Sequence, residues 1–265
     1  MTDVVIAPRE EDARAAEAVK QHHAQMSGVL AGHVERLVAA VTRSDAAAAE
    51  AARELLSAWC EGELLPHAKA EEAALYPAAQ RTVEGRLLVE GMVAEHETIG
   101  ALVRAVAAGA GDLVRVVADA AALRAVFESH LAKENDLVVP LLLGTPGVSV
   151  AALLGGMHEL LGEGADHAAE PTGGCGSGHA CSCGEVDPAG HPELDARTIP
   201  HSIRHATIFG ALETVPAGGG LVLVASHDPL PLLAQLEQRW PGRFSVTYEE
   251  RGPEVWRLSL ARAAA

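Results

Sequence analysis

The sequence predicts an all-α, up-down-up-down four-helix bundle, followed by a small two-layer α/β domain. Over residues 10–162, apolar residues recur at alternating spacings of three and four, which is typical of amphipathic helices joined by short connections. Over residues 193–261, short apolar runs alternate with helix-length segments in the order β-α-β-α-β-β, which is typical of a two-layer α/β fold. Residues 163–192 lack periodicity and are rich in Gly, Ala, His and Pro, so we expect a linker there.

Four breaks divide the first region into four long helices. They fall at Ser44-Asp45, between Thr82 and Gly85, between Gly109 and Gly111, and between Gly144 and Gly147. Ser44 or Asp45 can cap the start of a helix, and the glycines can end helices in the left-handed conformation. A short fifth helix that covers the bundle is expected from Ser149 to Leu161, which contains four leucines.

The inward-facing seam of each helix follows from the same spacing, and every seam includes ionisable residues. The predicted seams are Val19, His23, Met26, Leu30, His33, Leu37 and Val41 in the first helix; Cys60, Leu64, His67, Glu71, Ala74 and Ala78 in the second; Val89, Met92, His96, Ile99, Val103 and Val106 in the third; and Leu123, Phe127, His130, Glu134, Leu137 and Leu141 in the fourth. Pro66 is expected to kink the second helix, whereas Pro77 and Pro140 are expected to mark fraying ends.

Six of these ionisable residues are expected to lie in one layer, because antiparallel neighbours place the start of one helix beside the end of the next. Two pairs are four residues apart, so each pair shares one helix face. The layer consists of His23, His67, Glu71, His96, His130 and Glu134. His33 is expected roughly 15 Å further along the axis. His22 lies on a poorer apolar stripe, so we prefer His23 as the inward residue and keep His22 as the alternative.

These residue types indicate a metal site. A buried carboxylate is costly unless it is paired or bound to a metal, and no Lys or Arg lies on a seam to neutralise Glu71 or Glu134. Imidazole and carboxylate without thiolate suit iron, zinc or manganese, and vacant positions are typical of non-haem iron. Two carboxylates can each bridge two metals with two imidazoles per metal. This arithmetic favours a dinuclear site with room for an oxo or hydroxo bridge and a diatomic ligand.

The order of these residues along the helices resembles the hemerythrin-like (HHE cation-binding) family over roughly residues 15–143. The resemblance implies a four-helix bundle with two non-haem irons per chain, bridged by Glu71 and Glu134 and by an oxo or hydroxo group, with the four histidines as terminal ligands. Oxygen-carrying hemerythrin has two histidines four apart on its third helix, whereas His96 is followed here by Gly100. The site is therefore closer to the four-His, two-Glu branch that includes iron-centre repair proteins.

From this resemblance we expect binding or sensing of oxygen, nitric oxide or peroxide in the response to oxidative or nitrosative stress. The alternative is an iron storage or donor protein that supplies an iron-accepting partner for the repair of iron-sulfur centres, and a redox partner protein is also compatible. A weak peroxidase-, catalase- or nitric-oxide-reductase-like activity is a third interpretation, although the sequence shows no dedicated acid-base pair beyond the ligands.

The linker contains Cys175, His179, Cys181 and Cys183 in a Gly-rich setting. These side chains could hold zinc or a small iron-sulfur unit, accept iron from the bundle, form a reversible disulfide, or remain free thiols. Cys60 lies on a helix seam and is expected to pack as a small apolar residue.

The C-terminal region resembles a domain family of unknown function that is related in fold to TusA-like sulfur carriers. The residues that carry the resemblance are Leu194-Asp-Ala-Arg197, Arg204-His205, the run from Leu221, His227-Asp228-Pro229 and Arg251-Gly-Pro-Glu-Val-Trp256. Sulfur carriers use a Cys-Pro near the first helix, but the equivalent stretch here is Pro200-His201, which argues against persulfide transfer by that route. Asp228 is expected to cap the second helix, and His205 and His227 could converge at a strand end.

The composition excludes some function classes. The formal net charge is -16, with no basic run, which argues against a nucleic-acid partner. No apolar run reaches the length of about eighteen residues that a membrane span requires, and the first twenty residues do not resemble a secretion signal. We therefore expect a cytoplasmic protein with no membrane partner.

Overall fold

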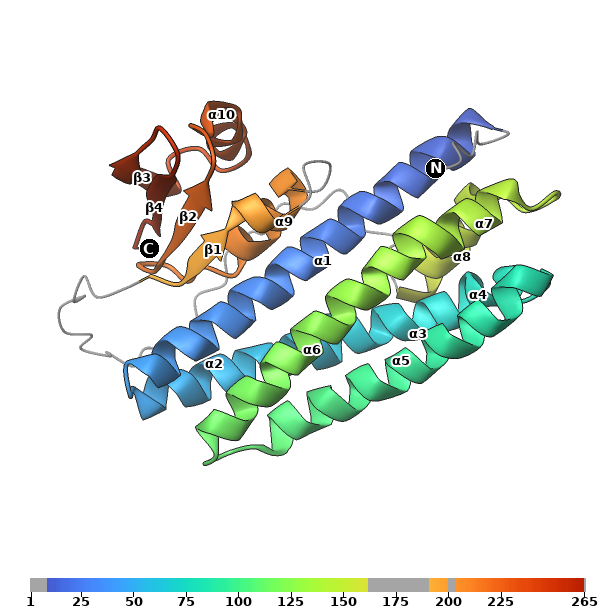
Figure 1. The fold of residues 1–265 in the computed structure, drawn as a ribbon, viewed down its shortest axis with the longest axis horizontal. Helices are drawn as coiled ribbons and strands as arrows, with labels where there is room; N and C mark the ends of the chain where they lie inside the picture. Colours follow the sequence, from blue (N-terminus) through green and yellow to red (C-terminus); the bar gives the residue numbers. More distant parts are fainter. Residues whose placement is uncertain (1–8, 162–190, 200–203, 265) are drawn as a thin grey trace, which may run out of the picture.

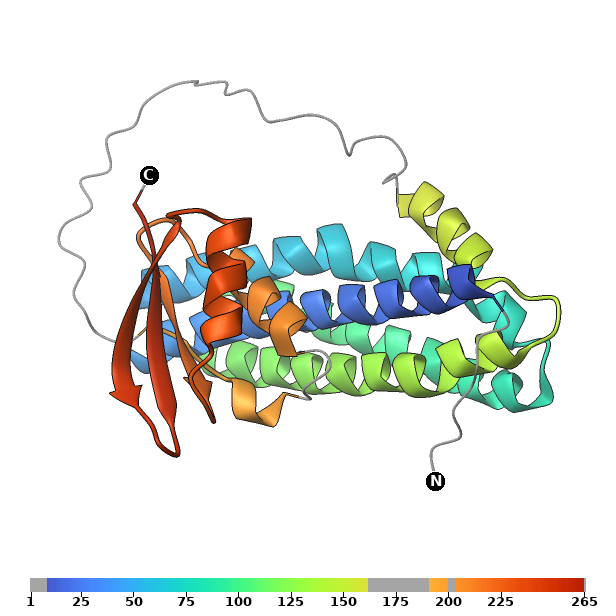
Figure 2. The ribbon, with the colours of Figure 1, turned by 90° about the horizontal axis from the view of Figure 1, so that it is seen from above.

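The computed structural model describes residues 9–161, 191–199 and 204–264. The first of these ranges is helical, and its long segments lie side by side as an elongated bundle (Figures 1 and 2). The helices are α1 (Glu10–Thr42), α2 (Ala46–Trp59), α3 (Leu65–Ala74), α4 (Tyr76–Ala79), α5 (Val83–Ala108), α6 (Leu113–Lys133), α7 (Val139–Gly144) and α8 (Val150–Leu161). None of the helices in the described ranges combines the length and the apolar character that crossing a membrane requires.

Side-chain caps fix three of the helix starts. Asp45 accepts a hydrogen bond from the backbone N–H of Ala48 at 3.0 Å, Thr82 from that of Gly85 at 2.9 Å, and Asp112 from that of Arg115 at 3.1 Å. These bonds satisfy backbone donors that have no partner within the helix. The caps stand at three of the four predicted breaks.

Two π-helical turns interrupt the second and fourth segments, at η1 (Cys60–Leu64) and η2 (Glu134–Val138). In each turn a backbone N–H bonds the carbonyl five residues earlier, and a proline, Pro66 or Pro140, follows two residues after the turn. A proline has no N–H to give to an α-helical ladder, so the wider turn takes up the mismatch. The helix continues past Pro140 to Gly144, so the prediction of a fraying end at Pro140 is wrong.

The extra residue in η2 changes which side of the fourth segment faces inward. Leu137, which the regular spacing predicts on the seam, is 49% exposed, and Leu141 is only partly buried. Val138 and Leu142, one position later, are fully buried instead. A π turn holds more residues per turn than an α-helix, and this shifts the apolar face by one residue.

The bundle core consists of two apolar clusters at different heights. One contains Leu30, Leu56, Ile99 and Phe127, and the other contains Val19, Val89, Met92, Val138 and Leu142. Along every long segment, the six ionisable residues fall between these two clusters. Helix α8 covers the second cluster with Val150, Leu154 and Met157, as the sequence predicts for its fifth helix.

The C-terminal residues form a four-stranded sheet with two helices, in the predicted order β-α-β-α-β-β. The elements are β1 (Glu193–Asp195), the short 3-10 helix η3 (Ala196–Thr198), α9 (Arg204–Glu213), β2 (Gly220–Ala225), α10 (Leu230–Arg239), β3 (Phe244–Arg251) and β4 (Trp256–Arg262). The strand order is β1-β2-β4-β3, with β1 and β2 parallel and the other pairs antiparallel. Strand β1 ends at Asp195, and Arg197 lies in η3.

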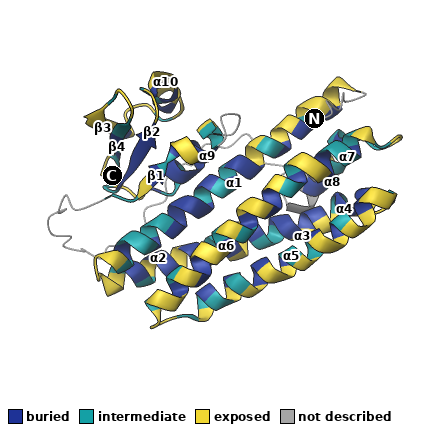
Figure 3. Cartoon of the chain, viewed as in Figure 1, coloured by how far each residue is buried: buried dark blue, intermediate teal, exposed yellow. Residues whose placement is uncertain are grey.

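Helix α9 packs directly on α1, so the C-terminal domain rests on the bundle (Figure 2). The contact depends on Gly28, Gly32 and Gly210, because a Cβ at Gly28 would lie 2.0 Å from the carbonyl oxygen of Thr207. Figure 3 shows dark, buried positions along α1, and these include Ala24, Gly28 and Gly32 in addition to the seam residues that face the bundle. Helix α1 is therefore covered on two sides.

Candidate metal centre

The structure brings all six predicted residues together in one buried layer. His23 comes from α1, His67 and Glu71 from α3, His96 from α5, His130 from α6, and Glu134 from the start of η2. Each is between 1% and 8% exposed. Their ligand-type atoms form two overlapping groups, and within each group all atoms lie within 4.8 Å of one another. The groups are His23, His67, Glu71 and Glu134, and Glu71, His96 and His130.

Each carboxylate spans the two imidazole pairs. Glu71 places Oε1 at 2.9 Å from Nε2 of His67 and at 3.4 Å from Nε2 of His23, while its Oε2 lies 3.6 Å from Nε2 of His96. Glu134 places Oε2 at 3.7 Å from Nε2 of His23 and Oε1 at 3.6 Å from Nε2 of His130. One oxygen of each carboxylate therefore faces one pair of histidines, and the other oxygen faces the second pair.

Several of these buried atoms have no hydrogen-bond partner. Among the described residues, His67 Nε2, Glu71 Oε1 and Glu134 Oε2 are buried and make no hydrogen bond. A buried polar atom without a partner is costly, and here three such atoms of three residues converge on the same space. The donor set therefore fits a bound cation.

The charges in the layer depend on one another. Burial alone would raise the pKa of the Glu71 carboxyl, but the imidazoles of His67, His23 and His96 hold that pKa well below its usual value. Burial would lower the pKa of His23, and the Glu71 and Glu134 carboxylates reverse this and raise it. Because metal ligands bind without their protons, metal binding to this layer is expected to release protons.

Tyr76 is a further polar residue in the layer. Its hydroxyl donates a 2.7 Å hydrogen bond to Oε1 of Glu134 and lies 3.4 Å from Nε2 of His130. Burial, followed by the charges of Glu134 and Glu71, raises the pKa of Tyr76, so the phenol keeps its proton. The spacing does not predict Tyr76, because it lies five residues after Glu71, directly after the turn at Leu75 that separates α3 from α4.

Three of the four histidines have a polar partner at Nδ1, the ring nitrogen that faces away from Glu71 and Glu134. His96 Nδ1 lies 2.7 Å from Glu72 Oε1, His130 Nδ1 lies 3.1 Å from Glu95 Oε2, and His23 Nδ1 lies 2.9 Å from Asn135 Oδ1. Such bonds fix the tautomer, so that Nε2 is free to bind a metal. Glu72, Glu95 and Asn135 are each sequence neighbours of a layer residue, a signal that could have identified them.

His22 and His33 lie outside both groups. The ring of His22 is 5.1 Å from that of His67, but the residue is exposed. His33 is 8% exposed, and its ring lies tilted against that of Trp59 with centroids 5.9 Å apart. Burial, with the charge of Arg36, lowers the pKa of His33 to about 4. The role of the six residues as ligands stays a prediction, and the geometry favours His23 over His22.

The remaining candidate residues have separate surroundings. Cys60 is a buried free thiol whose pKa is raised to about 12 by burial and by Glu61, in agreement with a packing role. Cys175, His179, Cys181 and Cys183 lie outside the described residues, as do Pro200 and His201.

In the C-terminal domain, His205 and His227 line one cavity of about 250 Å³ beside β2. The predicted capping role of Asp228 is wrong, because its Oδ1 accepts a hydrogen bond from Tyr248 at 2.8 Å and Pro229 occupies the N-cap of α10.

Comparison with known protein families gave two matches. Residues 14–142 match the hemerythrin HHE cation-binding domain, and residues 193–262 match an uncharacterized conserved protein family (DUF2249). Comparison with curated proteins and with solved structures gave no significant match.

Proposed function

Because residues 14–142 belong to the hemerythrin HHE cation-binding family and residues 193–262 to a conserved family without assigned function, we propose that this metal-binding chain is a non-haem di-iron protein that binds or senses oxygen, nitric oxide or peroxide under oxidative or nitrosative stress. The observation that carries the proposal is the pair of carboxylates, Glu71 and Glu134. Each directs one oxygen toward His23 and its other oxygen toward the second imidazole pair. This is the arrangement that two bridged metals require.

The donors support iron as the metal. The layer offers four imidazoles and two carboxylates with no thiolate, a set that suits iron better than copper(I). The four imidazoles and the two carboxylates would hold the metals, and six protein ligands for two metals would leave room for an exogenous small molecule. Bound iron would supply reversible ligand binding and a change of oxidation state.

The protein residues would bind, orient and shield the centre. The carboxylates hold the two positions at a fixed separation, and Glu72, Glu95 and Asn135 orient the imidazoles that face them. The apolar clusters above and below the layer exclude bulk water. Tyr76 donates a hydrogen bond to Glu134 and so orients this carboxylate.

Iron loading of the full chain tests the proposal. After anaerobic loading with iron(II), the protein is expected to hold two irons and to change its absorption spectrum on addition of oxygen, nitric oxide or peroxide while it retains the iron. Glu71→Gln keeps the shape of the side chain but removes the charge, so this variant should lose most of its iron. A chain that binds no iron, or whose iron ignores all three small molecules, would contradict the proposal.

The alternative is an iron donor for the repair of iron-sulfur centres, and one observation favours it. His67 Nδ1 has no hydrogen-bond partner among the described residues, so one of the imidazoles is less firmly held than the others. A donor should transfer iron to a metal-free acceptor protein, whereas a sensor should keep it. A catalase-like enzyme should instead convert peroxide to oxygen and water over many turnovers per site, and an oxygen electrode detects the oxygen released.

A further inference from the structure

The two imidazole pairs of the metal centre, His23 with His67 and His96 with His130, differ in their hydrogen-bond partners at Nδ1. His96 and His130 each have a carboxylate at Nδ1, Glu72 at 2.7 Å and Glu95 at 3.1 Å, and Lys133 in turn contacts Glu95. A carboxylate at the outer nitrogen makes an imidazole a stronger ligand and fixes the plane of its ring. This pair is therefore prepared to hold a cation firmly.

The other pair lacks such support. His23 has only the neutral amide of Asn135 at Nδ1, at 2.9 Å, and His67 Nδ1 has no partner in the part of the chain that the structure describes. Glu71 and Glu134 serve both positions, so they do not compensate for the difference. A cation bound by His23 and His67 has the weaker ligands.

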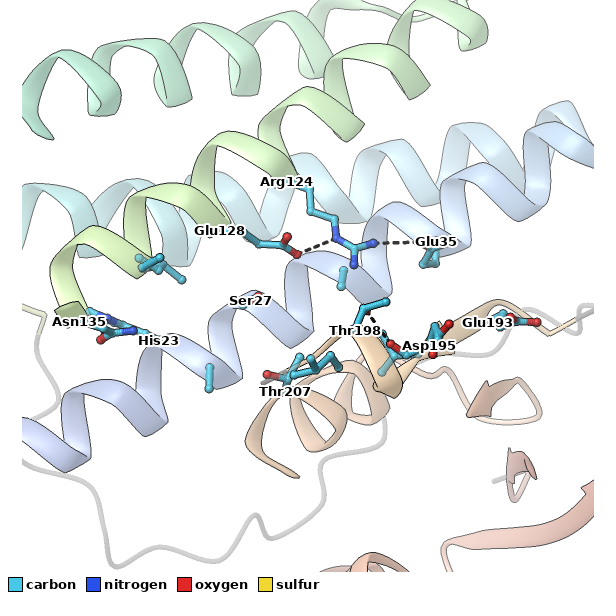
Figure 4. A pocket seen from close by; sticks show the side chains of 16 residues that line it. His23, Ser27, Glu35, Arg124, Glu128, Asn135, Glu193, Asp195, Thr198 and Thr207 are labelled. Atoms are coloured by element: carbon cyan, nitrogen blue, oxygen red, sulfur yellow. Dashed lines mark hydrogen bonds and ion pairs between the residues drawn. The ribbon is translucent and has the colours of Figure 1, made fainter. Parts of the chain in front are cut away.

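A cavity lies beside His23, one member of the weaker pair. It has a volume of about 500 Å³, lies between α1, α6 and the C-terminal domain, and is lined at one end by His23 and Asn135 (Figure 4). Its walls carry Glu35 and Glu128 of the bundle, which share one guanidinium, that of Arg124.

Glu193 and Asp195 of the C-terminal domain complete the wall, where they pair with Arg257 and Arg197 at 2.7 Å each. Of the four histidines of the layer, His23 lines this cavity, whereas His67, His96 and His130 do not. The wall therefore has four carboxylates against the three guanidinium groups that pair with them, those of Arg124, Arg197 and Arg257, and this small negative excess beside His23 favours a divalent cation over an anion.

From these observations we propose that the centre is asymmetric: the position at His23 and His67 exchanges its divalent cation through the interdomain cavity, and the position at His96 and His130 retains its cation. This inference rests on the proposed function, since it presupposes two metal positions. Glu72, Glu95 and Asn135 act in it as positioning residues, through the imidazoles that they contact. The C-terminal domain gains a role as one wall of the exchange route.

Release of iron(II) to a coloured ferrous chelator, measured anaerobically on the loaded full-length chain, tests the inference. Two phases of one iron each are expected, with rates about 10- to 100-fold apart, the usual effect of an outer hydrogen bond on metal affinity. Asn135→Asp gives His23 a carboxylate, so it should slow the fast phase only. Glu72→Gln and Glu95→Gln should accelerate the slow phase only.

Obstruction of the cavity gives an independent test. Ser27→Phe places a ring in the cavity one turn from His23 and should slow the fast phase, whereas Thr98→Phe, at an exposed position of α5 away from the cavity, should change neither phase. General damage to the fold would accelerate both phases together, which circular dichroism would detect.

The outcomes distinguish failure of the asymmetric exchange from failure of the di-iron proposal. Release of two irons in a single phase, or a fast phase unchanged in Asn135→Asp and in Ser27→Phe, overturns the asymmetry and leaves the di-iron proposal standing. Failure of the parent protein to hold iron overturns the proposed function instead.

Discussion

Replacement of Gly28 by alanine tests how tightly the C-terminal domain is attached to the bundle. The new Cβ would lie 2.0 Å from the Thr207 carbonyl oxygen, far inside van der Waals contact, and both atoms belong to helix backbones that have no rotamer to change. The helices α1 and α9 must therefore separate by roughly 1 Å, which forfeits about a quarter to a half of each dispersion contact between them. Overpacking of this kind costs about 1 to 3 kcal/mol.

The same substitution at Gly91 provides the control. Gly91 lies in the interior of α5 with no atom within 4 Å of an added Cβ. Both variants gain the helix propensity of alanine, about 1 kcal/mol, so the difference between them isolates the overpacking. Gly91→Ala should be the more stable variant by about 1 to 3 kcal/mol in urea unfolding, and only Gly28→Ala should lose hydrogen-exchange protection in α9. Equal stabilisation of both variants, with α9 still protected, would refute the close packing of the two domains.

Three further predictions concern single residues. Burial lowers the pKa of His33 to about 4, whereas an unfolded histidine titrates near pH 6.5. The unfolded state therefore takes up the proton first, and the stability of the folded protein falls as the pH drops from about 6.5 to 4. In urea titrations of the metal-free protein, His33→Leu should remove on the order of 3 kcal/mol of that pH dependence, and an unchanged dependence would contradict it. Tyr76→Phe deprives Glu134 of its buried donor and should lower the stability of the metal-free protein by about 1 to 3 kcal/mol without unfolding it; a stability equal to the parent's would show that the bond is not formed. Leu137→Glu should change the melting temperature little, while Val138→Glu should prevent folding at room temperature, and the reverse ranking would exclude the π turn.

The sequence was most informative where one helical period runs without interruption. His23 and His96 stand on long, regular helices, so their spacing to Val19 and Met92 predicts their inward position directly. The same spacing wrongly predicts that Leu137 faces inward, because spacings of three and four do not account for the additional residue in the π turn η2.

Contacts between elements that are distant in the sequence could not be predicted. Asn135 meets His23 across 112 positions, and Gly210 meets Gln25 across the whole linker. The apolar periodicity of α1 and of α9 does not indicate that α9 covers the side of α1 that faces away from the bundle core. The close approach of glycines becomes apparent only when both helices are placed in space.

The claim of an iron pair is tested most directly by the ultraviolet-visible spectrum of the iron-loaded chain, recorded in air and after reduction, with the metal content measured on the same sample. We expect two irons per chain, with charge-transfer bands of an oxo- or hydroxo-bridged pair in air that disappear on reduction. A content well below one iron per chain, or a spectrum without such bands at full loading, would contradict the claim.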